Sequence, residues 1–182
     1  MRNAPRHLVC AVLVLGTLIA PNMWAASKLE IDARVRATME QLYKEEPIAR
    51  ELSAKASGIL VFPRVIKVGI GIGGEHGEGS LLVKGNPVQY YRTTAASIGF
   101  QLGGQAKSEV LMFMDPTALD KFRASDGWEA GVDGGVAIVK FGVGKEIDTH
   151  SVRDPIIGFV FGNRGLMYDL SLEGAKFWKI NK

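Results

Sequence analysis

Glycine is the residue that most constrains the fold of this chain. The sequence of 182 residues holds 22 glycines, well above the usual share of roughly 7%, and most lie between Gly69 and Gly174. Residues 67–73 alternate branched side chains with lysine or glycine, which predicts a β-strand with one almost bare face. Glycine inside a strand usually marks a bend or the close approach of another backbone. We therefore expect a strongly curved sheet or a packed crossing, and favour a ligand at that face less.

Two helices are predicted ahead of the glycine-rich region. Residues 28–46 form an amphipathic helix, because apolar residues recur at helical spacing at Ile31, Val35, Met39 and Leu42. Pro47 suits the first turn of a second short helix, which Gly58 ends. Two interpretations of the apolar stripe stay open. Either it packs on the domain's own sheet, or it inserts at a membrane surface.

The rest of the chain is typical of short strands. They are expected at 59–62, 67–73, 80–83, 88–92, 97–104, 109–114, 128–139, 156–161 and 166–172, with a turn at 84–87. Asp115 and Pro116 open one short inserted helix. The fold class is therefore α+β: N-terminal helices followed by a glycine-rich, curved antiparallel sheet or barrel-like domain.

Residues 1–27 have the three parts of a signal peptide. Arg2 and Arg6 form the basic part, residues 8–20 the apolar part, and small residues follow Pro21. The apolar run is shorter than the roughly 20 residues that span a bilayer. We expect cleavage close to residue 27 and a single mature domain over 28–182, exported to the periplasm, the outer membrane or the cell surface, or secreted. An uncleaved anchor is the alternative.

The single cysteine offers a second alternative for the N-terminus. Cys10 lies inside the predicted signal peptide, so the cleaved chain has no cysteine and forms no disulfide. Lipid anchoring at Cys10 would instead make the protein a lipoprotein. The residues before Cys10 lack the small side chain expected next to an acylated cysteine, and the apolar run follows Cys10 instead of preceding it. Cleavage is therefore favoured.

Net charge argues against nucleic acid as a partner. The formal charge of +3 includes Arg2 and Arg6, so that the remainder of the chain carries only +1. Nucleic-acid-binding proteins normally have a strong basic excess. Any basic site in this protein must be local.

The short sequence motifs are weak evidence for nucleotide binding, metal binding or catalysis. The spacing G-x-G-x-x-G at 69–74 lies within the strand pattern and does not lead into a helix, so dinucleotide binding is not favoured. Glu75, His76 and Glu78 are expected in a solvated turn, and their spacing matches no metal-ligand pattern. His150 has no recognisable triad partners, and no nucleophile elbow is present. We expect no enzyme activity, no metal and no cofactor.

From residue 54 to residue 182 the chain resembles the SYLF domain, a lipid-binding family of bacteria and of eukaryotic membrane and actin adaptors. The matching blocks are KASGILVFP at 55–63, KVG at 67–69, GG at 73–74, GEG at 77–79, SIGFQLG at 97–103, ALDKF at 118–122, GL at 165–166 and SLEG at 171–174. The chain departs from the usual Ser-Tyr-Ser stretch, where it has residues 156–161 and then Arg164. The helix at 28–46 lies outside the best-matched region.

The resemblance implies non-enzymatic binding to anionic phospholipid headgroups on a membrane surface. For an exported bacterial protein these would be phosphatidylglycerol, cardiolipin or another anionic lipid, and actin is not inferred as a partner. The basic residues expected to contact lipid are Lys28, Arg34, Arg36, Lys44, Arg64, Lys67 and Arg164. The alternative is a structural or protein-interaction domain of the envelope that has no lipid site.

Overall fold

The computed structural model describes residues 26–140, 154–165, 172 and 174–182, without the side chains of 69–72, 97–104, 140 and 163–165. Three helices and six strands are defined in this part of the chain. They are α1 (Lys28–Glu45), α2 (Pro47–Lys55), β1 (Gly58–Val83), β2 (Asn86–Phe113), α3 (Pro116–Ala124), β3 (Trp128–Glu129), β4 (Ala137–Lys140), β5 (Ile156–Gly165) and β6 (Lys176–Ile180).

A long hairpin of β1 and β2 forms most of the sheet. The two antiparallel strands have 26 and 28 residues, so the short strands predicted from 59–62 to 109–114 are parts of two continuous ones. Lys84 and Gly85 join them with φ values of 51° and 77°, the left-handed pair that a tight hairpin turn requires. The turn predicted here is confirmed. The solvated turn expected around His76 is wrong, because this residue lies inside β1 opposite Thr94.

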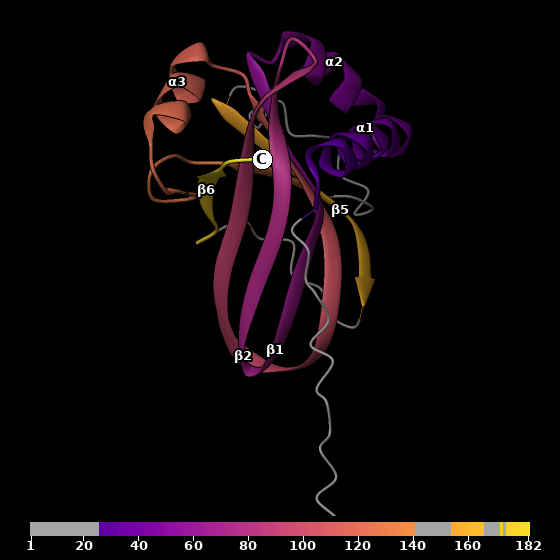
Figure 1. Ribbon diagram of the computed structural model, residues 1–182, viewed down its shortest axis with the longest axis vertical. Coiled ribbons are helices and arrows are strands. Elements are labelled where there is room, and N and C mark those ends of the chain that lie inside the picture. The colour runs from indigo at the N-terminus through magenta and orange to yellow at the C-terminus, as the bar shows by residue number, and fades with distance from the viewer. Residues whose placement is uncertain (1–25, 141–153, 166–171, 173) are drawn as a thin grey trace, which may run out of the picture.

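The hairpin folds back on itself at its glycine-rich end (Figure 1). Lys67 Nζ lies 3.3 Å from Glu75 Oε1, whereas eight residues of straight strand would separate their backbones by about 26 Å. The β1–β2 register shifts between Gly69 and Gly71. On the returning half, a Cβ added at Gly77 would lie 2.9 Å from the carbonyl oxygen of Arg64. The predicted curvature and packed crossing are therefore confirmed.

The remaining strands line the second edge of β2. In the described sheet the order is β3-β6-β2-β5-β4, with β1 on the other edge of β2. β5 pairs with the second half of β2 and β6 with the first half, both antiparallel. β4 and β5 run parallel, so the expected antiparallel sheet is mixed at this edge. The strand expected at 166–172 lies almost entirely outside the described residues, and β6 was not predicted.

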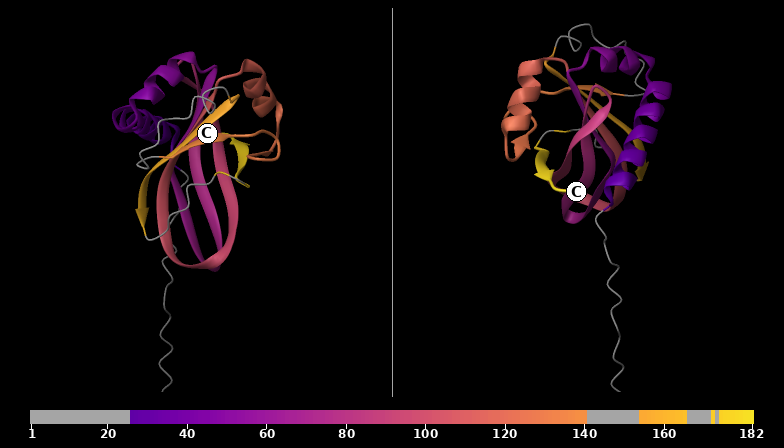
Figure 2. Two further views of the ribbon diagram at one scale, coloured as in Figure 1. Left: turned by 180° about the vertical axis from the view of Figure 1, so that it is seen from behind. Right: turned by 45° about the horizontal axis from the view of Figure 1, so that its top comes forward.

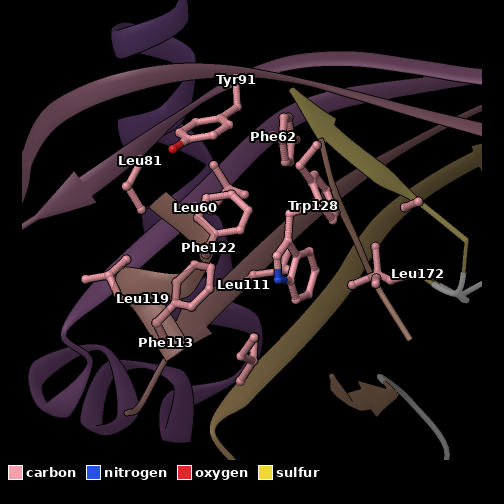
Figure 3. Close-up of a cluster of buried hydrophobic side chains, with 14 of the residues drawn as sticks. Leu60, Phe62, Leu81, Tyr91, Leu111, Phe113, Leu119, Phe122, Trp128 and Leu172 are labelled. Carbon is pink, nitrogen blue, oxygen red and sulfur yellow. The ribbon is translucent and has the colours of Figure 1, made fainter. Parts of the chain in front are cut away.

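Alternate residues of the hairpin face two different cores. The inner core lies within the folded hairpin, where the Phe122 ring of α3 packs 4.9 Å from the rings of Tyr91 and Phe113 (Figure 3). The outer core lies under α1 and α2, on the opposite side of the sheet from α3 (Figure 2). Ile31, Val35, Met39 and Leu42 are all buried in this outer core. The structure thus decides between the two interpretations of the stripe: it packs on the sheet.

Helix termini follow the local sequence. Ser27 caps α1 by accepting a hydrogen bond from the Glu30 amide, and Asp115 caps α3 through the Thr117 amide at 2.9 Å. Over the described residues, no helix combines the length and apolar character that crossing a membrane would require.

Candidate functional site

A pocket of about 320 Å³ lies between α1 and the two halves of β1. We call it the arginine pocket, because Arg34 of α1, Arg64 of β1 and Arg92 of β2 all line it. These residues are brought together by the folded hairpin, since Arg64 lies on the outgoing half of β1 and Arg92 pairs with Glu78 on the returning half. The complete lining is Ala26, Ile31, Arg34, Pro63, Arg64, Ile66, His76, Gly77, Glu78 and Arg92.

Cations outweigh anions in this pocket. Glu78 is already engaged by Lys182, whose Nζ lies 2.8 Å from its Oε2. Arg34 pairs with Glu30 on the exposed side of α1. Within the described parts of the chain, Arg64 and Arg92 form no ion pair, and both are exposed. Two guanidinium groups are therefore available to an anion, and guanidinium geometry suits phosphate and carboxylate oxygens.

His76 is exposed at the edge of the same pocket. It adds one imidazole to the lining of the pocket, and a ring N–H of that imidazole can donate a hydrogen bond to an anion. The described residues contain no group of three or more His, Cys, Asp or Glu side chains placed to hold a metal ion. The chemistry that this pocket supports in the described structure is anion binding.

A second group of charges is buried inside the folded hairpin. Lys107 Nζ lies 3.0 Å from Glu75 Oε2 and 3.1 Å from Glu109 Oε1, and Lys67 contacts the other oxygen of Glu75. We call these four residues the buried charge cluster. Burial lowers the pKa of Lys107, but the carboxylates of Glu109 and Glu75 outweigh it and raise this pKa above 10.5. Lys107 is therefore a cation at neutral pH.

The seven basic residues that the sequence analysis expected to contact lipid lie in different places in the structure. Arg34 and Arg64 lie in the arginine pocket. Lys28 packs with its Nζ 5.6 Å from the centre of the Tyr90 ring, while Arg36 and Lys44 are exposed on α1 and do not line the pocket. Arg164 lies opposite Ala106 in β5, and its side chain is outside the described residues.

Lys67 is not the surface residue that the sequence suggested. Only 1% of it is exposed, and its amine pairs with Glu75 inside the hairpin. The physical reason is a β-bulge between Phe62 and Val65, which changes the face on which the following residues lie. Lys67 cannot reach a membrane surface from this position.

Arg92 and His76 are pocket residues that sequence reasoning missed. The available signal was the turn at Lys84 and Gly85, which sets the register of β1 against β2. Counting back from that turn would place Tyr91 opposite Glu78. A register shift between Leu81 and Leu82 brings Arg92 there instead.

Most of the chain is similar to known proteins. Residues 94–181 match the family model Ysc84, described as Las17-binding protein actin regulator. A relative, Beta cell expansion factor A of Aeromonas veronii, is 26% identical over 167 residues. That similarity covers 90% of this chain and 61% of the relative, so the chain spans about three fifths of the relative's length. The family match begins after Arg92 and so does not include the arginine pocket.

Proposed function

We propose that the chain, which resembles the SYLF domain and matches the Ysc84 family model over residues 94–181, is a non-enzymatic membrane-binding protein whose arginine pocket takes the anionic headgroup of a phospholipid. The observation that carries this proposal is the meeting of Arg34, Arg64 and Arg92 in one pocket. The three arginines come from α1, β1 and β2, and together they form one basic site in an almost neutral protein.

Local concentration of charge explains how such a protein could hold a membrane. A basic residue near an anionic membrane surface contributes about 1 kcal/mol, and the attraction falls off within a Debye length. A few arginines in one place therefore support weak, salt-sensitive docking without a strongly basic surface. Arginine also fits a phosphate better than lysine does, because its planar guanidinium donates two parallel hydrogen bonds.

The proposal includes the cellular setting inferred from the N-terminus. Residues 1–27 direct export, and the mature domain meets phosphatidylglycerol, cardiolipin or another anionic lipid from the periplasmic side or at the cell surface. The protein acts without cofactor or metal and does not bind nucleic acid.

Protein interaction is the second candidate function. The matching family model is described by its binding to a protein, Las17, and the described surface includes Trp178, which is partly exposed on β6. Aromatic residues such as tryptophan are enriched at protein interfaces. In this case the fold would present a partner surface and the arginine pocket would not bind lipid.

Vesicle co-sedimentation of the whole chain tests the lipid proposal. Reversing Arg64 and Arg92 to Glu should weaken binding to phosphatidylglycerol vesicles at least about thirtyfold, because two attractive contacts worth about 1 kcal/mol each are lost. The matched control is Lys121→Glu on α3, an exposed cation outside the pocket. All variants keep residues 1–27, so any contribution of that segment is the same in each.

Salt and lipid composition supply the remaining controls. Wild-type binding should decline as sodium chloride is raised and should be much weaker on phosphatidylcholine vesicles. Equal affinity of the wild type and a folded Arg64→Glu/Arg92→Glu variant would remove the pocket from the site. If the wild type ignores anionic vesicles at low salt, lipid binding is wrong and the protein-interaction candidate takes its place.

A further inference from the structure

Residues 64–68 of β1 show an inverted pattern of burial. Val65 and Lys67 face the inside of the folded hairpin, with 0% and 1% exposed. Ile66 and Val68 face outward, with 39% and 57% exposed. A strand with one face in water normally points its apolar side chains inward and its charged ones outward. Here a lysine is inside and two branched apolar residues are outside.

The β-bulge in β1 produces this inversion. Leu60 and Phe62 belong to the inner core, and strict alternation from them would place Ile66 and Val68 inside and Lys67 outside. The shift between Phe62 and Val65 reverses the faces. Bulges are common next to functional sites, where they change the direction of side chains. The cost of this one is a buried lysine, which the carboxylate of Glu75 neutralises.

The two exposed residues adjoin two small residues of β2 and the arginine pocket. Ile66 pairs with Ala106 of β2, and Val68 pairs with Gly104. Ile66 also lines the arginine pocket with Arg64 and Arg92. We call Ile66, Val68 and Ala106 the apolar strip. The apolar strip lies beside the guanidinium groups of the arginine pocket. This combination is complementary to an anionic bilayer, where charged headgroups surround an apolar interior.

We propose, in an inference that rests on the proposed function, that Ile66 and Val68 of the apolar strip enter the membrane at the headgroup boundary while the arginine pocket holds a lipid phosphate. The membrane-contacting element is then the outgoing half of β1. It is not the apolar stripe of α1, which the outer core already buries. A second copy of this chain is the other occupant that could cover an apolar strip, but the guanidinium groups next to it favour an anionic surface.

A fluorescent probe at single positions tests the insertion. In the full chain with Cys10→Ser, Val68→Cys is labelled with an environment-sensitive dye and mixed with phosphatidylglycerol vesicles. The emission should shift to the blue and be quenched by lipids brominated on their acyl chains. The matched control is Val88→Cys on β2, which is 48% exposed and does not line the pocket. Its emission should stay unchanged.

The affinity of unlabelled variants supplies the second readout. Ile66→Ser/Val68→Ser should reduce the affinity for vesicles at least tenfold. The fold-change in affinity between low and high salt should be the same for this variant as for the wild type. Val88→Ser should bind normally. The serine variants remove apolar contacts only, so the salt dependence set by the arginines should persist.

The outcomes separate this inference from the proposed function. If the wild type binds anionic vesicles but the probe at position 68 is not quenched, insertion is wrong and headgroup binding stands. If neither the wild type nor any variant binds anionic vesicles, both proposals are wrong. If the wild type forms a dimer that Ile66→Ser/Val68→Ser abolishes, and the probe responds to dimerisation instead of vesicles, a second copy covers the strip and insertion is overturned.

Discussion

At the scale of single residues, Tyr90 and Tyr91 show how one position along a strand changes the role of the same side chain. Tyr90 faces the outer core, and its hydroxyl donates to Asp32 of α1 at 2.9 Å. Tyr91 faces the inner core, and its buried hydroxyl has no hydrogen-bond partner among the described residues. Burial raises the pKa of both to about 12, with the Asp32 carboxylate adding to the effect for Tyr90 and the Arg123 cation opposing it for Tyr91.

The tyrosines predict a loss of stability at alkaline pH. Their folded pKa values lie above the ordinary value of 10.0, so their contribution is complete below pH 10 and is lost as pH rises from about 10 to about 12. Urea unfolding across this range should show the decline. Tyr91→Phe should make this decline in stability between about pH 10 and about pH 12 smaller. At pH 8 the free energy of unfolding of this variant should be unchanged or higher, because an unpaired buried hydroxyl is removed. Tyr90→Phe should cost about 1 kcal/mol at pH 8. Equal losses in both variants would contradict this assignment.

The buried charge cluster gives a second prediction at the residue scale. Glu75→Gln removes the carboxylate that faces both Lys67 and Lys107, and should lower the free energy of unfolding by about 3–5 kcal/mol, the usual effect of removing one partner of a buried ion pair. The control is Glu78→Gln in the same strand, which breaks a more exposed pair with Lys182 and should cost about 1 kcal/mol or less. Similar chemical denaturation curves for the two variants would mean that the cluster is open to water.

At the scale of elements, the folded hairpin depends on glycines that let one half of β1 lie against the other. A Cβ added at Gly79 would collide with the carbonyl oxygen of Val61 and lie 2.8 Å from Cδ1 of Phe62. At Gly74 in the same strand, the nearest atom would be the Ala95 carbonyl oxygen at 3.9 Å, an ordinary contact. These two glycines of the same strand therefore have different roles.

Alanine substitution distinguishes the two roles. Gly79→Ala should lower the free energy of unfolding by at least about 2 kcal/mol, because backbone and a core ring must move apart. Gly74→Ala should be neutral or slightly stabilising, since alanine restricts the unfolded chain. Thermal or urea unfolding measures both. Comparable destabilisation by the two substitutions would show that the close packing of β1 on itself is not the reason for Gly79.

At the scale of the whole molecule, the proposed signal cleavage would act on the start of α1. Ser27 is the N-cap of α1, and the Ala26 carbonyl accepts a hydrogen bond from Lys182. Cleavage after Ser27 would remove this cap, at a cost of about 1 kcal/mol, and would place a new positive amino group at the positive end of the helix dipole. Cleavage before Ser27 keeps the cap.

Intact mass of the protein from the cell envelope tests the export proposal. The cap at Ser27 favours cleavage just before this residue, slightly ahead of the boundary at 27/28 that the sequence suggested. We therefore expect a mature chain that has lost the apolar segment at 8–20 and that keeps Ser27. A mass that includes residues 1–25 would contradict cleavage. A diacylglyceryl group on Cys10 would establish the lipoprotein alternative instead.

Sequence alone determined the features that depend on local patterns. Helical spacing of apolar residues gave α1, proline and the acidic cap gave α3, and Lys84 with Gly85 gave the turn of the long hairpin. The density of glycine indicated strong curvature and close packing, because only a residue without a Cβ permits a backbone to approach as closely as β1 does at Gly77 and Gly79. The resemblance to the SYLF family was also present in the order of short sequence blocks.

Only the tertiary structure decided which residues share a site and which faces are exposed. Alternation predicts two faces of a strand but does not tell where a bulge reverses them, and the bulge after Phe62 placed Lys67 inside and Ile66 outside. Arg34, Arg64 and Arg92 are distant in sequence, and their meeting depends on the fold-back of the hairpin and on α1 packing over it. Local patterns carry no information on such distances, because long-range pairing is set by the sum of many contacts across the molecule.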